Sequence, residues 1–275
     1  MPHGVLPAIV TTVGFDPFSS LERRDVGISL AVLAAIAVAV VVILHARVRS
    51  RELPSEVTLR PGSARVRGVR PDDLDFCAAL HAETLPHGFF AELGVRSLRA
   101  YLATFVASPH AVALLVEADE TPVGMIVGIL RPGAHIRWVV HHRGVRLALL
   151  AGLALATRPR LAVRFARTRI SRYRRVWSAR KAGPAVEPAG QPAVLSHVAV
   201  VPAAQGAGLG AQLVDAFVDA ARAAGCRRVV LVTLAGDAGA AGFYLRHGWT
   251  TSGLRRDFDG EPMTELMLPV GVEER

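Results

Sequence analysis

The chain has 275 residues, enough for one or two domains, and 51% of them are hydrophobic. Its formal charge at pH 7 is +9, and it holds only two cysteines. Cys77 and Cys226 form neither a C-x-x-C pair nor a metal-binding spacing, which argues against a disulfide framework or a cysteine-held metal and indicates a reducing compartment.

The first feature along the chain is an uncharged apolar run from Val26 to Leu44, VGISLAVLAAIAVAVVVIL. Its length is close to the ~20 residues that cross a bilayer as a helix, so we expect a transmembrane helix within an N-terminal segment, residues 1–50. A secretory signal peptide is one alternative, but the run starts late and is followed by HARVRSR rather than a small-residue cleavage site. A buried core helix is the other, although helices that are apolar all round are unusual in a domain of this size.

Arginines flank this run unequally. Arg23 and Arg24 precede it, whereas Arg47, Arg49 and Arg51 follow it. Because positive residues near a span stay on the cytoplasmic side, we expect a single-pass membrane protein with the rest of the chain in the cytoplasm.

A polar, proline-containing stretch at residues 51–64 predicts a tether between the apolar run and the first predicted strand. The next residues predict that short strand and then a helix from about Pro71 to Leu85, with aspartates at its positive end. A second amphipathic helix is expected over residues 88–108, and a hairpin of two apolar strands over residues 110–130.

The C-terminal part continues this mixture of strands and helices. AVLSHVAVV predicts a strand, and a glycine cluster separates it from an amphipathic helix. RRVVLVTLAG predicts a buried strand, AGAAGFYLRHG a short helix ended by Gly248, and the last residues a closing hairpin. The order predicts a mixed α/β (α+β) fold. One face of the amphipathic helix carries Leu213, Val214, Phe217, Val218 and Ala221.

A basic segment interrupts this order. Residues 131–185 contain 13 arginines, Lys181 and no acidic residue. Because the segment carries +14 and the whole chain +9, the rest of the chain carries −5. Its apolar positions predict two helices broken near Pro159. We therefore interpret residues of about 131–188 as a basic helical insert.

The glycine cluster stands where a strand meets a helix. At such a junction, backbone N–H groups and the positive end of the helix can hold a phosphate. A P-loop would need a Lys followed by Ser or Thr after the glycines, and these are missing. A dinucleotide fingerprint would need G-x-G-x-x-G near the first strand of a βαβ unit, whereas Gly206, Gly208 and Gly210 give G-x-G-x-G about three-quarters of the way along the chain.

A third pattern fits these residues. Gln205 to Gly210, QGAGLG, resembles the Q/R-x-x-G-x-G/A turn with which the GNAT family of N-acetyltransferases binds the pyrophosphate of acetyl-coenzyme A. HVAVVP before it looks like the fourth strand of that family, and the helix behind it like the third helix. DAGAAGFYLRHGW is similar to the second family motif, N-x-x-A-x-x-F-Y-x-x-x-G-F, with Asp237 in place of Asn and Trp249 in place of Phe. The resemblance covers about Arg65 to Pro269 without the insert.

The resemblance implies a GNAT-like domain over residues 65–275, a mixed and mostly antiparallel twisted sheet flanked by helices. In that family a bulge splays the fourth strand from the fifth, and the pantetheine arm lies in the gap. It also implies acetyl-CoA as co-substrate and no metal. The cofactor-binding residues it implies are Val198, Ala199, Val200, Gln205, Gly206, Ala207, Gly208, Leu209, Gly210, Asp237, Ala240, Phe243 and Tyr244.

The resemblance also points to an acid for the reaction. Tyr244 matches the family position that protonates the departing thiolate; the alternative is an aromatic that packs the short helix on the sheet. A fourth-strand N–H, that of Val198, would polarise the thioester carbonyl.

The base has no single candidate. Many relatives carry Glu on the fourth strand, where this sequence has Ser196 and His197. His197 is a candidate because the reference pKa of histidine is near 6.5, and a structural strand histidine is the alternative. Glu83, in HAETLPHG, lies where relatives line the acceptor pocket, and an exposed loop carboxylate is its alternative. His81 and His87 are weaker candidates.

These features together predict a membrane-tethered, acetyl-CoA-dependent N-acetyltransferase that moves an acetyl group directly from the thioester to an amine. Because the strand carboxylate is missing, the alternative is a membrane-tethered acyl-CoA-binding module without effective catalysis. The amine acceptor is not identified: protein N-termini, lysines, amino sugars on lipid carriers and small amines all fit. The tether favours anionic lipid over nucleic acid as partner of the basic insert, which we expect to lie as a helix pair on the membrane surface.

Overall fold

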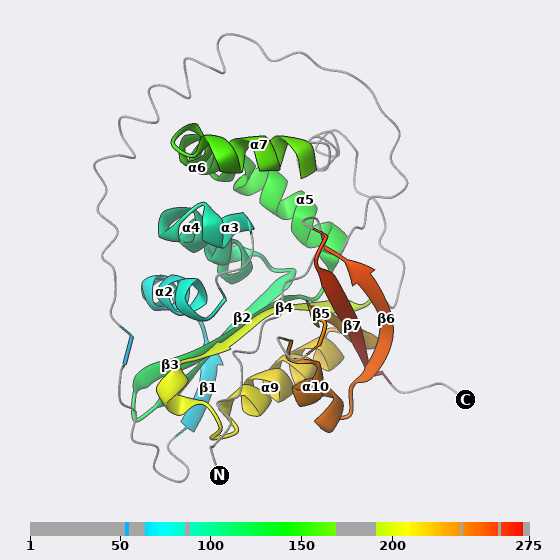
Figure 1. Ribbon diagram of the computed structural model, residues 1–275. Coiled ribbons are helices and arrows are strands. Elements are labelled where there is room, and N and C mark those ends of the chain that lie inside the picture. The colour runs from blue at the N-terminus through cyan, green and yellow to red at the C-terminus, as the bar shows by residue number, and fades with distance from the viewer. Residues whose placement is uncertain are drawn as a thin grey trace, which may run out of the picture.

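The computed structural model describes residues 53–54, 64–85, 89–168, 191–236, 239–257 and 260–271. One sheet of seven strands, in the order β1-β2-β3-β4-β5-β7-β6, is the centre of the fold (Figure 1). All neighbouring strands are antiparallel except β4 and β5, which are parallel. The prediction of a mixed, mostly antiparallel sheet is therefore confirmed.

The bounds of the elements follow the predicted order closely. The strands are β1 (Ala64–Gly68), β2 (Ala111–Ala118), β3 (Thr121–Ile129), β4 (Ala193–Val200), β5 (Arg228–Leu234), β6 (Thr250–Arg256) and β7 (Pro262–Pro269). The helices are the 3-10 helix η1 (Pro71–Asp73), α2 (Leu74–Thr84), α3 (Phe89–Glu92), α4 (Val95–Ala107), α5 (Pro132–His142), α6 (Gly144–Ala156), α7 (Pro159–Thr168), the 3-10 helix η3 (Pro202–Ala204), α9 (Leu209–Ala223) and α10 (Ala241–Arg246).

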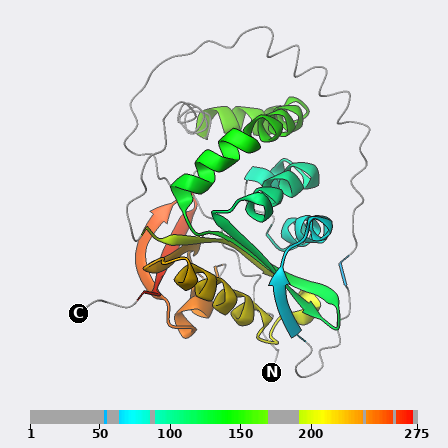
Figure 2. The ribbon, with the colours of Figure 1, turned by 180° about the vertical axis from the view of Figure 1, so that it is seen from behind.

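Helices cover both faces of the sheet. On one face α2 and α4 contact β3, and on the other α9 contacts β2, β3 and β4 (Figures 1 and 2). α10 lies on the side of α9, against β6 and β7. The five apolar residues predicted to form one face of α9 are all buried, so the amphipathic pattern placed this helix correctly.

The basic insert adds a layer outside the helices. α5, α6 and α7 follow β3 and lie beyond α3 and α4, and α6 contacts α4 (Figure 1). The predicted break near Pro159 is confirmed, because α6 ends at Ala156 and α7 begins at Pro159. α5 was not among the two helices expected; Pro132 in its first turn needs no N–H partner there.

The prediction of one helix over residues 88–108 is wrong. α3 ends at Glu92 and α4 begins at Val95. Gly94 between them has a φ of +94°, a conformation that an L side chain rarely adopts, so the chain turns there instead of continuing the helix.

The predicted transmembrane run at Val26 to Leu44 lies outside the described residues, as does most of the predicted tether. Within the described ranges, no helix has by itself the length and apolar composition of a membrane span. α5 and α6 meet that test only as a pair, with a bend of 75° between them.

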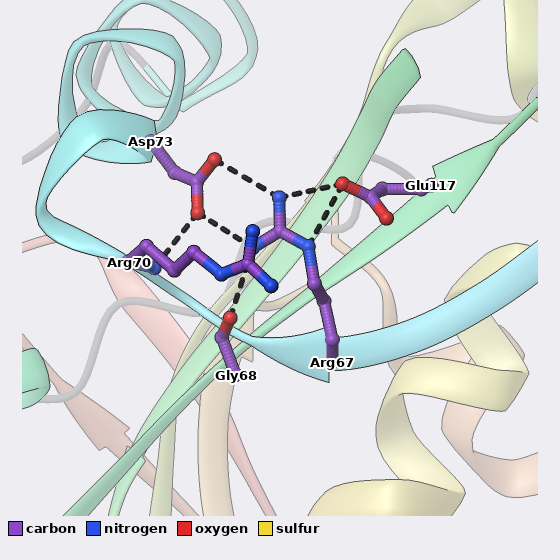
Figure 3. Close-up of polar contacts among 5 residues, drawn as sticks. All are labelled: Arg67, Gly68, Arg70, Asp73 and Glu117. Carbon is purple, nitrogen blue, oxygen red and sulfur yellow. Dashed lines mark hydrogen bonds and ion pairs between the residues drawn. The ribbon is translucent and has the colours of Figure 1, made fainter. Parts of the chain in front are cut away.

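A partly buried cluster of charges joins the first strand to the first helix (Figure 3). Arg67 of β1 donates to Asp73 of η1, with an Nη1 to Oδ2 distance of 2.6 Å. The same guanidinium donates to Glu117 of β2, with an Nε to Oε1 distance of 2.8 Å. The backbone N–H of Arg70 donates to Asp73 as well. Because Asp73 directly precedes α2, the cluster holds the start of that helix against the sheet edge.

Charge pairing sets how these groups titrate. The hydrogen bonds from Arg67 lower the pKa of the Asp73 carboxyl below its ordinary value, against the opposite effect of burial. The bonds to Asp73 and Glu117 raise the pKa of Arg67. A carboxyl whose pKa is lowered on folding stabilises the fold above its unfolded pKa, and this contribution is lost as pH falls through its folded pKa.

We therefore expect Asp73→Ala to destabilise the protein by about 3 kcal/mol at pH 7, because Arg67 would keep its charge with one partner removed. Below the unfolded pKa of Asp73, the difference in free energy of unfolding between wild type and variant should shrink as pH falls. The wild type then loses the stabilisation that the ionised Asp73 carboxylate provides. Urea unfolding at several pH values measures both effects.

Asp72→Ala is the matched control, because Asp72 is the neighbouring aspartate and is exposed. Its effect should stay within about 0.5 kcal/mol. Equal losses of stability for the two variants would contradict a special role for the Arg67 cluster.

Candidate active site

The fourth and fifth strands part soon after they meet. β4 pairs with β5 at two positions only, Ala193 with Val229 and Val194 with Val230. The register between β3 and β4 shifts at the next step: Gly128 pairs with Leu195, but Val127 pairs with His197. Ser196 is therefore an extra residue, a β-bulge, which bends its strand and increases the local twist.

Beyond the bulge, β4 continues along β3 alone. Val198, Ala199 and Val200 pair with β3 and with no residue of β5. Successive peptide groups of a strand point to its two sides, so part of this backbone is turned toward the side from which β5 has departed. The three residues expected to line the cofactor arm lie in this stretch.

The glycine turn follows directly at the end of β4. Gly206 and Gly208 have φ of +82° and +79°, and a Cβ on either would meet no atom within 4 Å. Gly208 is the N-cap of the 15-residue helix α9 and offers no side-chain cap. Because the first N–H groups of a helix have no partner within the helix, this turn presents donors at a positive helix end, with open space in front of its glycines.

Gln205 ties the turn to the strand. Its side-chain Nε2 donates to the carbonyl of Val200 at 3.1 Å. Gln205 therefore fixes where the turn begins, and the donors that the turn itself offers are backbone N–H groups.

Tyr244 lies on α10 and is completely buried. Its ring contacts Trp249 edge-on, with centroids 5.2 Å apart. The backbone N–H of Ala240, before α10, donates to the hydroxyl of Thr233 on β5, which fixes the short helix to that strand. The second motif is thus held beside β5, the strand on the far side of the gap from β4. Asp237 of the same motif lies outside the described residues.

His197 lies just after the bulge and is 7% exposed. Its Nε2 is 3.2 Å from the hydroxyl of Tyr101 on α4. The ring of His81, from α2, contacts it edge-on with centroids 4.6 Å apart. His197 is therefore on the α2 and α4 face of the sheet, joined to two side chains that come from different helices.

Glu83 is not part of this group. It is exposed near the end of α2, whereas His81, two residues earlier, is buried. Residues two apart on a helix point to nearly opposite sides, so the turn of α2 that directs His81 to the sheet directs Glu83 to solvent. The structure brings His81, rather than Glu83, to His197. His87 lies outside the described residues.

Two buried histidines are held in the neutral form. Burial lowers the pKa of His81 to about 4, and it also lowers the pKa of His135 on α5 to about 4. The Nδ1 of His135 is 2.9 Å from the hydroxyl of Ser108. Sequence analysis did not identify Tyr101, Ser108 or His135. Tyr101 pairs with His197 and Ser108 with His135, and the partners lie on different segments, so no local motif marks them.

The insert reaches this face of the molecule through α7. Phe165 stacks on Phe89 of α3, with centroids 4.9 Å apart and planes 19° apart. Arg164 pairs with the carboxylate of Glu92, and Arg158 donates to the backbone carbonyl of the same residue at 2.9 Å. The insert therefore packs on α3, close to the helix that carries Tyr101.

The part of the chain that the structure describes contains no candidate metal site. No group of three or more His, Cys, Asp or Glu side chains is arranged there to hold an ion.

Comparison with known proteins agrees with this geometry. Residues 165–249 match the model of the acetyltransferase (GNAT) family. The matched range includes β4, the glycine turn, α9, β5 and α10, which are the elements that build the gap. The resemblance of the two motifs to the GNAT family is therefore confirmed. No curated protein sequence matches the chain.

Solved structures are similar to this chain at low identity. The crystal structure of SsHAT is 21% identical, with a TM-score of 0.50 over 76% of this chain and 98% of that one. The ribosomal-protein-S18-alanine N-acetyltransferase from Escherichia coli is 15% identical, with a TM-score of 0.44 over 77% and 98%. An aminoglycoside 6'-N-acetyltransferase complexed with coenzyme A is 11% identical, with a TM-score of 0.49 over 77% and 99%. The likeness to SsHAT shows a shared fold.

Proposed function

We propose that this chain, whose residues 165–249 match the acetyltransferase (GNAT) family, is an acetyl-CoA-dependent N-acetyltransferase that moves an acetyl group directly from the thioester to an amine. The observation that carries the proposal is the arrangement of the glycine turn at the end of β4, where β5 no longer pairs with that strand. The strand backbone that has no β5 partner therefore leads directly into the backbone N–H groups that would hold the phosphates.

The turn suits a pyrophosphate. Backbone N–H groups from Gly206 to Gly210 would receive its oxygens, and the dipole of α9 favours its negative charge without a lysine or arginine. Gly206 and Gly208 have open space where a Cβ would stand, so an anion can approach the backbone closely. The arm beyond the pyrophosphate would lie along Val198, Ala199 and Val200.

Transfer to an amine requires three contributions from the protein. The amine nitrogen attacks the thioester carbonyl carbon, the new C–N bond forms, and the C–S bond breaks. A base removes the extra proton from nitrogen, and an acid gives a proton to the thiolate. An N–H donor must also stabilise the negative charge on the carbonyl oxygen, a role that suits Val198 just beyond the bulge.

We assign the acid role to Tyr244, since it lies on α10, whose preceding residue Ala240 bonds to Thr233 of β5. We assign the base role to His197 ahead of Glu83. His197 is on the strand that would carry the thioester and bonds to Tyr101, whereas Glu83 is exposed. A histidine whose orientation is set by a second side chain is a usual form of general base.

An acyl-CoA-binding module without effective catalysis is the second candidate. The complete burial of Tyr244 against Trp249 supports it, because a purely structural aromatic would look the same. The two candidates share the turn and differ in what the Tyr244 hydroxyl does.

Attachment to a membrane is a further part of the proposal. The apolar run of residues 26–44 would anchor the chain with its catalytic domain in the cytoplasm, and the insert would lie on the same leaflet. Val145 of α6 and Val163 of α7 are each 52% exposed, and four leucines of α6 are only partly buried. Apolar side chains at the surface, next to many arginines and no acidic residue, are the composition of an interfacial helix.

The first prediction concerns the turn. Gly208→Val should weaken acetyl-CoA binding about tenfold or more, because the side chain would enter the space of the pyrophosphate. Gly225→Val is a matched control at the other end of α9, where φ is +75° and a Cβ likewise meets nothing. Both glycine variants carry the same backbone strain. Gln205→Ala should weaken acetyl-CoA binding less than Gly208→Val does. If calorimetry gives equal acetyl-CoA affinities for the two glycine variants, the assignment of the turn as the pyrophosphate site is contradicted.

The second prediction separates enzyme from binding module. Tyr244→Phe should keep the fold and the acetyl-CoA affinity but slow transfer by roughly 10²-fold, the usual loss for one proton-transfer group. Single-turnover transfer from labelled acetyl-CoA to a panel of amines measures it. Trp249→Phe disturbs the same packing without touching the hydroxyl and should cost only a few-fold. Undiminished transfer by Tyr244→Phe, with chemistry rate-limiting, rules out Tyr244 as the acid.

The third prediction concerns the membrane. A chain shortened to begin at Ser55 should lose the anchor but still bind vesicles that contain anionic lipid, and this binding should weaken as salt rises. Five arginines of the insert should carry most of it: Arg167, Arg169, Arg172, Arg174 and Arg175.

Five exposed arginines outside the insert form the control set: Arg65, Arg70, Arg227, Arg228 and Arg246. Vesicle sedimentation should show a large loss of binding when the first set is changed to Gln and a small loss for the control set. If the shortened chain does not bind anionic vesicles even at low salt, the insert has another partner, and nucleic acid or an acidic acceptor becomes the better hypothesis.

A further inference from the structure

One buried histidine has no hydrogen-bond partner among the described residues. His81, on α2, is 3% exposed, and both Nδ1 and Nε2 are buried and unbonded. A buried polar group without a partner lowers stability, so such groups are rare in native proteins and suggest a missing ligand or water. The proposed chemistry at His197 and Tyr244 gives His81 no role.

His81 stands in a row of rings that reaches the proposed base. Its ring contacts His197, and His197 bonds to Tyr101. Tyr101 stacks on Phe90 of α3, with centroids 4.2 Å apart and planes 9° apart, and meets Phe105 edge-on. Phe90 and Tyr101 are each only partly buried. The row therefore runs from the surface between α3 and α4 to the interior beside the bulge of β4.

The chemistry of His81 limits what it can bind. Burial lowers its pKa to about 4, so the ring is neutral at pH 7. A neutral imidazole donates through one nitrogen and accepts through the other. It can accept a bond from an amine N–H, but it offers no positive charge to a carboxylate or a phosphate. The rings that lead to it are aromatic, and a charged group among them would lose its hydration.

We propose that His81 binds the amino group of the acceptor, beside the His197 and Tyr101 pair, and that the acceptor carries this amine on an apolar chain or ring that packs against Phe90 and Tyr101. This inference rests on the proposed N-acetyltransferase function and narrows its substrate class. His81 would position the amine nitrogen, while His197 would remove its proton.

The test uses the full chain, acetyl-CoA and two probe amines, benzylamine and 4-(aminomethyl)benzoate, which differ by one carboxylate. His81→Phe should raise the melting temperature by roughly 2–4 °C, because an unpaired polar group is replaced by an apolar ring. It should raise KM for benzylamine about tenfold or more, and leave kcat and the acetyl-CoA affinity within about threefold. His81→Gln, which restores a polar group, should recover part of the KM.

His135→Phe is the matched control, since His135 is also buried and neutral but bonds to Ser108. It should lower the melting temperature and leave KM for benzylamine unchanged. Wild-type protein should favour benzylamine over 4-(aminomethyl)benzoate by about tenfold or more in kcat/KM.

The proposal is overturned if His81→Phe stabilises the protein with no change in KM, because His81 is then a core histidine. It is also overturned if the carboxylate-bearing probe is the better substrate. If the wild type binds acetyl-CoA but acetylates no amine, the proposed function fails. The inference is then judged by NMR of ¹⁵N-histidine: shifts of the His81 ring on addition of benzylamine support it, and unchanged signals overturn it.

Discussion

The brevity of the parallel pairing between β4 and β5 is the constraint on which the site depends. Two strands that share an α/β sheet ordinarily pair along their common length, but here they meet at only two positions. Ser196, inserted as a bulge, bends β4 away while β3 continues to pair with it. The strand backbone beyond the bulge thus faces a gap, with the glycine turn at its end and α10 fixed to the strand opposite.

The same bulge determines what lies on the other face. Inserting one residue reverses which side chains point to each side, so His197 is directed at α2 and α4. α2 can present His81 to it because Arg67 holds the start of that helix to β1 and β2. The proposed cofactor arm would therefore lie along the edge of β4 that β5 leaves unpaired, and the proposed amine would bind on the face that α2 and α4 cover.

The insert packs on the same side of the sheet as the proposed amine site. α7 contacts α3 through the stack of Phe165 on Phe89 and through Arg164, which pairs with Glu92; Arg158, just before α7, donates to the backbone carbonyl of Glu92. α3 in turn supplies Phe90, the outermost ring of the row that ends at His81. The proposed attachment of the insert to a membrane would therefore bring the access side of the proposed amine site close to the lipid surface.

Local chemistry allowed the sequence to predict much of this protein. Alternating and helical apolar periods marked the strands and α9, and glycines that require left-handed backbone marked the turn, since each signal is carried by neighbouring residues. Tertiary structure alone decided the rest. His81 and His197 are 116 positions apart, and whether His81 or Glu83 faces the sheet depends on how α2 is rotated by packing and by the Arg67 cluster. Contacts between distant segments leave no pattern in either segment, which is why Tyr101 and His135 emerged only from the fold and why the sequence offered His81 only as a weaker candidate base.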